Sequence, residues 1–231
     1  KLLRTVEFNQ KRLSEGLPIQ EQSLHSVFTG NSGTGKTTVA RLLGRVLFDR
    51  GVLPGDEFKF IEVSESDLIA THIGETAVQT QAILEKAKGG ILFIDEAYTL
   101  NKGKSSQHNF GLEAINTILK YMEDYRNEIM IIFAGYTKEM EQFFETNPGL
   151  KSRVPNTFFF EDYSGDEIVE MGLKNLQKSS YQLEDEAYYA MRVKQAYSRS
   201  LDHSNGRWIR NFNEHLMRAL ANRVVETQVD D

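Results

Sequence analysis

A glycine-rich stretch near the start of the chain limits the possible folds most strongly. Residues 30–37 read GNSGTGKT, which matches the phosphate-loop pattern GxxxxGK[ST]. This pattern works only where a strand enters the loop and a helix leaves it. Both are expected here, because a short apolar run at 26–29 precedes the loop and apolar residues follow it at helical spacing, at Val39, Leu42, Leu43, Val46 and Leu47. The fold class is therefore predicted to be α/β.

The residue types of this loop suit a bound nucleoside triphosphate. Glycines let the backbone wrap closely around an anion and turn its N–H groups towards it. The N-terminus of the following helix adds a positive dipole end, Lys36 reaches the β and γ phosphates, and Thr37 ligates Mg²⁺. We therefore expect ATP or GTP to bind at the loop residues, which are Gly30, Asn31, Ser32, Gly33, Thr34, Gly35, Lys36, Thr37 and Thr38.

The next part of the chain alternates between strand and helix patterns. Short apolar runs predict four further strands, at 58–63, 91–95, 129–134 and 157–160. Helical spacing predicts one helix at 77–87 and another along the stripe Ala114, Ile115, Ile118, Leu119 and Met122. A turn at Asn147-Pro148-Gly149 is expected before the last strand. Strands that alternate with helices are typical of a parallel sheet with crossover helices.

Only helical patterns follow residue 162. Ser164 and Glu167 match a capping box, in which the serine accepts from the first free N–H groups of a helix and the glutamate reaches back. Two more helical patterns lie around Ala187 and around Ile209. We therefore expect a large α/β nucleotide-binding domain at residues 1–162 and a small α-helical domain at residues 163–231.

Composition narrows the classes of function. With 27 Lys and Arg against 33 Asp and Glu, the net charge of −6 lacks the positive excess that drives sequence-independent nucleic-acid binding. The absence of cysteine excludes a thiol nucleophile and a thiolate metal site, and it suits a reducing cytoplasm. No apolar run approaches the ~20 residues that span a bilayer. We expect a cytoplasmic protein that binds neither nucleic acid nor membrane, and a trimmed N-terminus because Lys1 already stands in a helical pattern.

Two carboxylates follow one of the predicted buried strands. Ile91-Leu92-Phe93-Ile94 is apolar throughout, and Asp95 and Glu96 come directly after it. This arrangement delivers acidic groups to the carboxyl edge of a parallel sheet, where ligands bind, and it resembles a Walker B motif. Asp95 would hold the Mg²⁺ shell and Glu96 would act as general base on the attacking water. The alternative is an acidic pair that caps the next helix.

Further segments resemble one known family. The adjacent Asp95-Glu96, GYTKEM at 135–140, NPGLKSR at 147–153 and NGRWIRN at 205–211 together resemble AAA+ ATPases of the CbxX/CfxQ type. The resemblance covers nearly the whole chain. It implies a five-stranded parallel sheet in the order 5-1-4-3-2, an α-helical lid, hexameric rings and ATP-driven remodelling of a protein client.

The resemblance also implies roles for three single residues. Tyr136 stands where these ATPases carry the sensor-1 group, although a tyrosine at a strand end can equally be simple packing. Arg153 resembles the arginine finger that reaches the nucleotide of a neighbouring subunit, with a solvated surface charge as the alternative. Arg207 resembles sensor 2, a lid arginine that contacts the γ phosphate. Selectivity for adenine follows from the resemblance alone, because the segment that packs on the base would precede residue 1.

One segment departs from the family pattern. Residues 71–76 read THIGET and resemble the first pore loop, but histidine stands at position 72 where the family has tyrosine. Imidazole offers less apolar area for gripping a client chain and becomes charged near pH 6.5. The polar run 101–109 carries no assignment. The five histidines show no paired helical spacing, so we expect no zinc site.

These observations together predict a Mg²⁺-dependent ATPase that remodels a protein client in a homo-oligomeric ring. Three alternatives stay open. A P-loop kinase would need an acceptor pocket, and a nucleotide-switched scaffold would bind ATP and assemble without turnover. A DNA-remodelling motor is disfavoured by the acidic net charge.

Overall fold

Five strands form the central sheet of the computed structural model, which describes residues 2–18, 23–72, 74–101 and 110–229. Along the sheet they follow the order β2-β3-β4-β1-β5, and the pairs β2–β3, β3–β4 and β4–β1 are parallel. The bounds are β1 Ser26–Gly30, β2 Phe60–Val63, β3 Ile91–Ile94, β4 Met130–Gly135 and β5 Asn156–Phe160. The predicted α/β class and strand order 5-1-4-3-2 are both confirmed.

Burial differs between the central and the edge strands. Every residue of β1, β3 and β4 is buried, whereas β5 alternates between half-buried and exposed positions. Helices on both faces leave no solvated side to a central strand, so its sequence is apolar without alternation. The uninterrupted apolar runs in β3 and β4 therefore reflect their central position.

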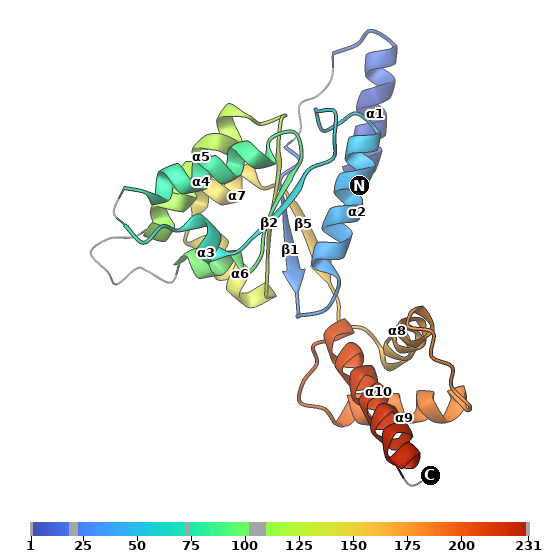
Figure 1. Ribbon diagram of the computed structural model, residues 1–231. Coiled ribbons are helices and arrows are strands. Elements are labelled where there is room, and N and C mark those ends of the chain that lie inside the picture. The colour runs from blue at the N-terminus through green and yellow to red at the C-terminus, as the bar shows by residue number, and fades with distance from the viewer. Residues whose placement is uncertain (1, 19–22, 73, 102–109, 230–231) are drawn as a thin grey trace. The chain divides into compact units, whose positions relative to one another are not determined.

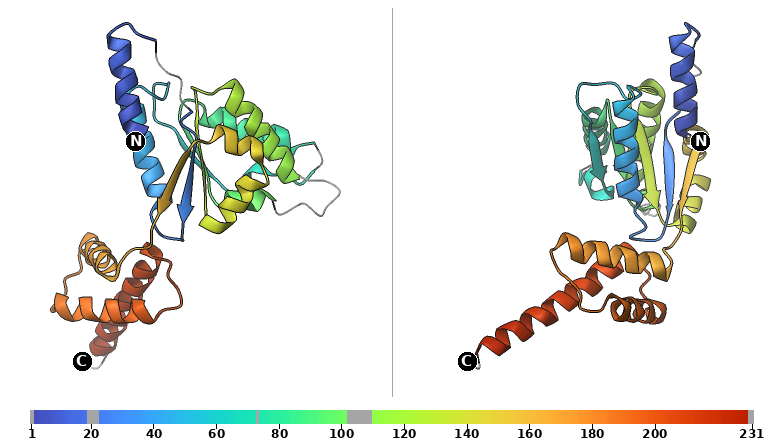
Figure 2. Two further views of the ribbon diagram at one scale, coloured as in Figure 1. Left: turned by 180° about the vertical axis from the view of Figure 1, so that it is seen from behind. Right: turned by 90° about the vertical axis from the view of Figure 1, so that its right-hand side faces the viewer.

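Helices cover both faces of the sheet (Figures 1 and 2). On one face lies α2, and α1 is joined to its end by a 2.6 Å ion pair between Arg50 and Glu7. On the other face lie α3 to α7. The bounds are α1 Leu2–Ser14, α2 Lys36–Asp49, α3 Glu65–Leu68, α4 Thr76–Ala87, the 3-10 helix η1 Ala97–Asn101, α5 Phe110–Asp124, α6 Thr137–Glu145 and α7 Pro148–Arg153.

The main core lies between the sheet and the α3–α7 layer. Alternate strand residues such as Leu92, Ile94, Ile131 and Phe133 point into it and meet apolar side chains from those helices. On the opposite face, a Cβ added to Gly44 of α2 would come within 2.3 Å of the Ile91 side chain. A glycine at this position lets α2 lie close against the strands.

One expectation needs correction, and one prediction is refined. The expected turn at 147–149 is the beginning of a helix, since Asn147 is the N-cap of α7 and Pro148 stands in its first turn, where a missing N–H costs nothing. The helix after the loop is present, but Val39, Leu42 and Val46 are exposed on it. Its buried face is instead formed by Ala40, Gly44 and Leu47.

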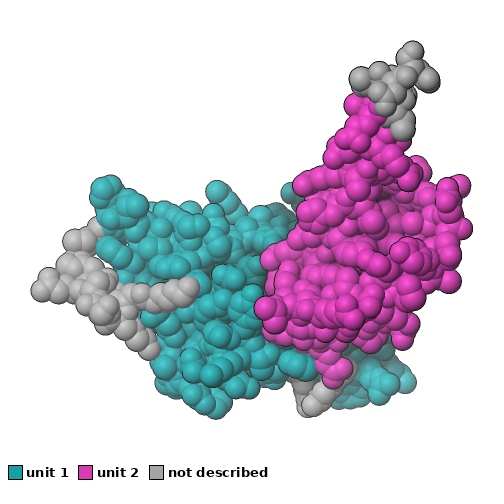
Figure 3. Space-filling view, turned by 90° about the horizontal axis from the view of Figure 1, so that it is seen from below, with its two compact units in different colours: residues 1–29, 36–159 teal, residues 30–35, 160–231 magenta. Residues whose placement is uncertain are grey.

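The chain divides into two compact units (Figure 3). Unit 1 comprises residues 1–29 and 36–159, and unit 2 comprises residues 30–35 and 160–231. Unit 2 contains α8 Gly165–Lys178, α9 Glu186–Arg199 and α10 Gly206–Val229. Its core includes Ile168, Val193 and Ile209, with Trp208 packed against it. The predicted capping box at the start of α8 is confirmed, because the Ser164 and Glu167 side chains each bind the other residue's backbone N–H.

Within the described parts of the chain, no helix is both long enough and apolar enough to cross a membrane.

Candidate active site

The carboxyl edge of the sheet in unit 1 brings several predicted residues to one side. Thr29 is paired with Gly135, and Ile94 is paired with Phe133. The residues that follow these strands, among them Asp95 after β3 and Tyr136 after β4, therefore leave the sheet at the same edge. Ligands of parallel α/β sheets bind outside this edge.

Lys36 and Thr37 stand in the first turn of α2. Their backbone N–H groups belong to the positive end of a 14-residue helix. The loop that links β1 to this helix contains Gly30, Gly33 and Gly35 with φ of 147°, 70° and 92°, conformations that side-chain-bearing residues rarely adopt. The loop backbone therefore has the unusual dihedral angles that a tight wrap around an anion requires.

Glu96 has a strained backbone conformation. Its φ is 47°, in the left-handed region, which few residues other than glycine occupy. The Glu96 N–H donates to Asp95 Oδ1 at 3.0 Å, and the Glu96 carbonyl accepts from both the backbone N–H and the hydroxyl of Thr99 at 2.8 Å. Strain of this kind costs about 1–3 kcal/mol and persists where the surroundings enforce it. These bonds hold the exposed Glu96 side chain at the end of β3.

Tyr98 is a site residue that sequence reasoning missed. Its ring centroid lies 6.3 Å from that of Tyr136, and its hydroxyl is close enough to Glu96 for the charge of that carboxylate to act on it. Burial, and next the negative charge of Glu96, raise the pKa of Tyr98 to about 12, so that the phenol keeps its proton at neutral pH. The available signal was its position, two residues after the predicted general base.

Arg153 lies at the C-terminal end of α7, on the same unit. Its Nε donates to Glu123 Oε2 of α5 at 3.1 Å, and one of its terminal nitrogens donates to the Gly149 carbonyl at 3.2 Å. The side chain remains about one-third exposed. Arg153 is thus held at the surface of unit 1 by two contacts that orient the guanidinium.

The loop residues 30–35 belong to unit 2, where they lie beside the start of α10. The N–H of Gly206 donates to the Gly33 carbonyl at 3.1 Å, and a Cβ on Gly33 would lie 3.0 Å from the backbone nitrogen of Arg207. Arg207, the predicted sensor 2, is exposed in the first turn of α10. The structure therefore brings Arg207 and the predicted phosphate loop together in one unit.

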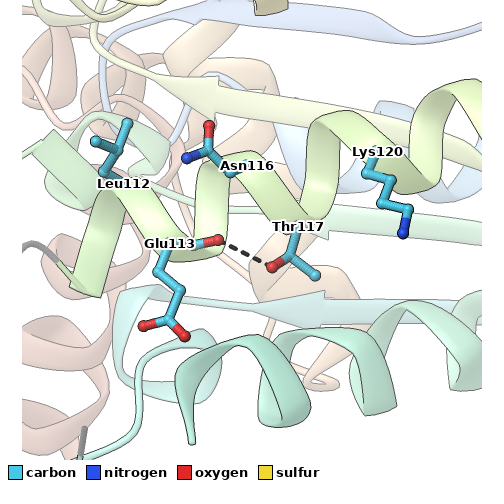
Figure 4. Close-up of a pocket in the computed structure, with 5 residues that line it drawn as sticks. All are labelled: Leu112, Glu113, Asn116, Thr117 and Lys120. Carbon is cyan, nitrogen blue, oxygen red and sulfur yellow. Dashed lines mark hydrogen bonds between the residues drawn. The ribbon is translucent and has the colours of Figure 1, made fainter. Parts of the chain in front are cut away.

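The segments 71–76 and 101–109 are described only in part. His72 is exposed, Ile73 lies outside the described residues, and so does the segment 102–109. Figure 4 shows an open groove along α5, lined by Leu112, Glu113, Asn116, Thr117 and Lys120. Its one carboxylate already accepts from the Ala77 N–H at the start of α4, at 3.3 Å.

Comparison with known proteins agrees with this geometry. Residues 26–162 match the family model described as "ATPase family associated with various cellular activities (AAA)". That range begins at β1 and ends just after β5, and so includes every strand of the sheet.

The chain belongs to the AAA family.

Its similar relatives are members of the CbxX/CfxQ group. Stage V sporulation protein K of Bacillus subtilis (strain 168) is 45% identical over 222 residues, which is 94% of this chain and 67% of the relative. Protein CbbX of Cereibacter sphaeroides is 39% identical over 223 residues, 96% of this chain and 71% of the relative. A chloroplastic ribulose bisphosphate carboxylase/oxygenase activase of Cyanidioschyzon merolae is 39% identical over 218 residues, 92% of this chain and 72% of the relative. The resemblance seen in the sequence is confirmed.

The side chains at the sheet edge suit Mg²⁺ rather than a metal with an all-protein cage. Among the described residues, no group of three or more His, Cys, Asp or Glu side chains is placed to hold a metal ion. Mg²⁺ is usually held by one or two carboxylates, water and the phosphates of a bound nucleotide. One carboxylate at the end of β3, Asp95, and one hydroxyl in the first turn of α2, Thr37, fit that requirement.

Proposed function

We propose that this chain is a Mg²⁺-dependent ATPase that acts on a protein client as a member of a homo-oligomeric ring. The AAA family membership supports nucleotide hydrolysis as the class of reaction. The observation that carries the proposal is the edge of unit 1, where the first turn of α2 presents Lys36 and Thr37 and where β3 ends in Asp95 and the strained Glu96. No other described edge of the sheet carries this combination.

In this proposal each residue has one task. Gly30–Gly35 offer backbone N–H groups to the phosphates, Lys36 places a positive charge beside the β and γ phosphates, and Arg207 contacts the γ phosphate. Thr37 and Asp95 hold Mg²⁺, which neutralises charge that develops on the transferred phosphoryl group. Glu96 accepts a proton from the attacking water. Tyr136 would contact the reacting end of the nucleotide as sensor 1.

Arg153 is proposed to act on the nucleotide of the neighbouring subunit. Its contacts within the chain, to Glu123 and to the Gly149 carbonyl, orient the guanidinium without burying it. An arginine supplied from a second subunit stabilises the charge of the transition state by about 10³–10⁵-fold in other NTPases. Such an arginine makes turnover depend on assembly, which supports a ring, and we propose a hexamer.

The client is proposed to be a protein. The names of the relatives include an activase of a carboxylase/oxygenase and a protein of sporulation, which supports an action on other macromolecules rather than on a metabolite. We propose that residues 1–162 form the nucleotide-binding domain and residues 163–231 the helical lid.

Turnover of the variant Glu96→Gln tests this proposal. Loss of a positioned general base typically lowers a rate by about 10²–10⁴-fold, and binding of ATP should be retained because glutamine keeps the size of the side chain. Glu141→Gln is the matched control, since Glu141 is an exposed glutamate of α6 away from the strand ends. Equal turnover in both variants would contradict the assignment of Glu96.

The same assay separates the alternatives. A kinase would release ADP only after addition of a phosphate acceptor, whereas the proposed ATPase needs none. A scaffold would keep its bound ATP intact for hours in a single-turnover experiment on assembled protein. Steady release of phosphate from ATP alone, lost in Glu96→Gln, is the result that we expect.

A further inference from the structure

The backbone carbonyls of the phosphate loop point to donors from the helical part of unit 2. Three successive carbonyls are bonded in this way: Ser32 to the Asn205 amide at 3.2 Å, Gly33 to the Gly206 N–H at 3.1 Å, and Thr34 to the Tyr163 hydroxyl at 3.1 Å. These contacts join residues that lie 129 to 173 positions apart in the sequence. We call the four residues Asp162, Tyr163, Asn205 and Gly206 the collar of the loop.

Asn205 is the centre of the collar. It is fully buried and has a left-handed φ of 53°, which asparagine tolerates better than most residues. Its Nδ2 donates to the carbonyls of Ser32 and His203 and to Asp162 Oδ1, at 3.2, 2.9 and 2.8 Å. Its Oδ1 accepts from the Tyr163 N–H at 2.9 Å and from the Tyr197 hydroxyl at 3.3 Å. Both ends of the amide are thus engaged.

Asp162 extends these contacts to the side chain of the loop. Both of its carboxylate oxygens accept from Asn31 Nδ2, at 3.0 and 2.8 Å, while one also accepts from Asn205. Within the loop, the Thr34 hydroxyl donates to the Asn31 carbonyl at 2.8 Å. The collar therefore contacts every residue from Asn31 to Thr34.

We propose that the collar positions the phosphate loop for the nucleotide, with Asn205 as its central positioning residue. This inference rests on the proposed function. In a peptide group the carbonyl and the N–H point in opposite directions, so donors that hold the carbonyls on the outside direct the N–H groups inward, towards the phosphates. A donor on a carbonyl also polarises its peptide group and strengthens the N–H as a donor.

A consequence is that nucleotide and helical domain are coupled through Asn205. Phosphates that order the loop also order the carbonyls that the collar holds. Preorganised donors bind an anion more tightly than donors that must first be arranged, because binding then costs less conformational entropy. Weakening the collar should therefore lower nucleotide affinity, and it should do so for ATP and ADP alike because both carry the phosphate that the loop surrounds.

Unit 2 contains a matched control for Asn205. Asn213 is also fully buried, donates from Nδ2 to the Gly172 carbonyl at 2.9 Å and accepts from the Tyr189 hydroxyl at 2.7 Å. Its hydrogen-bond partners Gly172, Asn175 and Tyr189 belong to α8 and α9 and not to the loop. Asn205→Asp and Asn213→Asp each turn a buried amide donor into an acceptor, but only the first change faces the phosphate loop.

Trp208 provides a signal from the same region. It is the single tryptophan of the chain, and its ring centroid lies 4.9 Å from that of Tyr197, whose hydroxyl donates to Asn205. Its Nε1 donates to the Ser200 hydroxyl at 3.1 Å. Fluorescence of Trp208 therefore reports on the surroundings of Asn205, and a nucleotide that acts through the collar should change it.

The experiment is a titration of the full chain with Mg·ADP and with a non-hydrolysable ATP analogue, followed by calorimetry and by Trp208 fluorescence. In the wild type we expect binding together with a change of fluorescence. In Asn205→Asp we expect the dissociation constant of both nucleotides to rise about tenfold or more and the change of fluorescence to be lost. Asn213→Asp should stay within about twofold of the wild type in affinity and keep the change of fluorescence.

A second pair of variants covers the case in which Asn205→Asp does not fold. Tyr163→Phe removes only the hydroxyl that binds the Thr34 carbonyl, and Tyr189→Phe removes only the hydroxyl that binds Asn213. We expect Tyr163→Phe to lose affinity about threefold to tenfold and Tyr189→Phe to keep the wild-type affinity. Wild-type affinity in folded Asn205→Asp or in Tyr163→Phe overturns the role of the collar. A wild type that binds neither nucleotide overturns the proposed function instead.

Discussion

The two units position their parts of the proposed site in different ways. In unit 1, Asp95 and Glu96 follow directly from a buried strand and Lys36 begins a helix, so that neighbouring segments of the chain place them. In unit 2, the loop 30–35 is held by side chains that lie 129 to 173 positions later in the chain. The chemistry thus depends on local segments, whereas the shape of the phosphate loop depends on long-range contacts.

This difference leads us to expect two separable kinds of defect. Apart from Lys36, which would contact the phosphates directly, changes at the edge of unit 1 should lower the rate of hydrolysis and leave nucleotide affinity intact. Changes around the loop in unit 2 should lower affinity first. Each of the following variants tests one side of this comparison.

The largest effect is expected for Arg153→Ala. If Arg153 stabilises the transition state from a neighbouring subunit, its removal should lower turnover by about 10³-fold or more and leave the affinity for ATP within about twofold. Steady-state hydrolysis and nucleotide titration on the same preparation measure both quantities.

A control separates this role from the ion pair within the chain. Glu123→Gln breaks the 3.1 Å contact with Arg153 and keeps the arginine. An exposed ion pair contributes at most about 1 kcal/mol, so this variant should retain most of the activity. If Glu123→Gln lowers turnover as much as Arg153→Ala, the ion pair and not the arginine's action in trans is what turnover requires.

Gly33→Ala tests the unit 2 side of the comparison. A Cβ at this position would lie 2.0 Å from the Ser204 carbonyl oxygen, and φ is already 70°. Strain of roughly 1–3 kcal/mol should weaken nucleotide binding tenfold to hundredfold. Gly51→Ala is the matched control, because its φ is 67° and nothing lies within 4 Å of the added Cβ. Equal affinities in the two variants would show that loop packing has no influence on binding.

The two units should also respond differently to acid. In unit 1, His25 is buried and its Nδ1 accepts from the Ile131 N–H at 3.0 Å. Burial, with a smaller contribution from the positive charge of Arg126, lowers the pKa of His25 from 6.5 to about 4. Between these values the unfolded chain binds a proton that the folded chain does not, so stability is complete above pH 6.5 and falls towards pH 4. This shift corresponds to about 3 kcal/mol.

Unit 2 should lose stability only at lower pH. Hydrogen bonds from Ser164 hold the pKa of the exposed Glu167 below its ordinary value of 4.5. The cap of α8 therefore contributes stability above pH 4.5 that is lost only below it. Hydrogen exchange of the Ile131 amide for unit 1 and Trp208 fluorescence for unit 2 separate the two transitions. His25→Gln should remove the change between pH 6.5 and 4.5, and an unchanged pH profile in that variant would contradict the assignment.

The smallest effect is expected for Tyr98→Phe. The hydroxyl that is removed lies near Glu96, whose charge raises its pKa, and we expect the general base to be less well oriented without it. We expect turnover to fall about twofold to fivefold, with affinity for ATP unchanged. Tyr125→Phe is a suitable control, because Tyr125 is a half-buried tyrosine of the same unit whose ring lies 4.3 Å from that of Tyr121. A loss of ATP affinity in Tyr98→Phe would contradict this prediction, because the residue would then act in nucleotide binding and not only in hydrolysis.

The strands could be predicted from the sequence because the decisive signals are local, whereas the strand order was implied by the family resemblance. Continuous apolar runs such as 91–94 identify central strands, and the loop pattern fixes where β1 ends and α2 begins. Short elements were not predicted. The helix α7, the 3-10 helix η1 and the four-residue α3 carry too few residues for a period to be visible, and at α7 the Asn-Pro-Gly sequence suits a helix start as well as a turn.

The collar could not be predicted, for a different reason. Asn205 stands in a segment that had drawn attention to Arg207, but nothing in the local sequence indicates that its amide meets the carbonyl of Ser32. Asp162 and Tyr163 mark the end of the strand region and carry no recognisable pattern. Tyr98 was missed because its effect on Glu96 depends on how the chain runs after β3. Such contacts become visible only when the chain is folded.

The central claim is that the loop and the sheet edge together bind a triphosphate with Mg²⁺ and hydrolyse it. Isothermal titration of the wild type and of Lys36→Ala with Mg·ATP tests this most directly, with Lys151→Ala as a control lysine at an exposed position of α7. We predict heat of binding for the wild type and Lys151→Ala, and its loss in Lys36→Ala. Absence of binding in the wild type, or equal binding in all three proteins, would contradict the account.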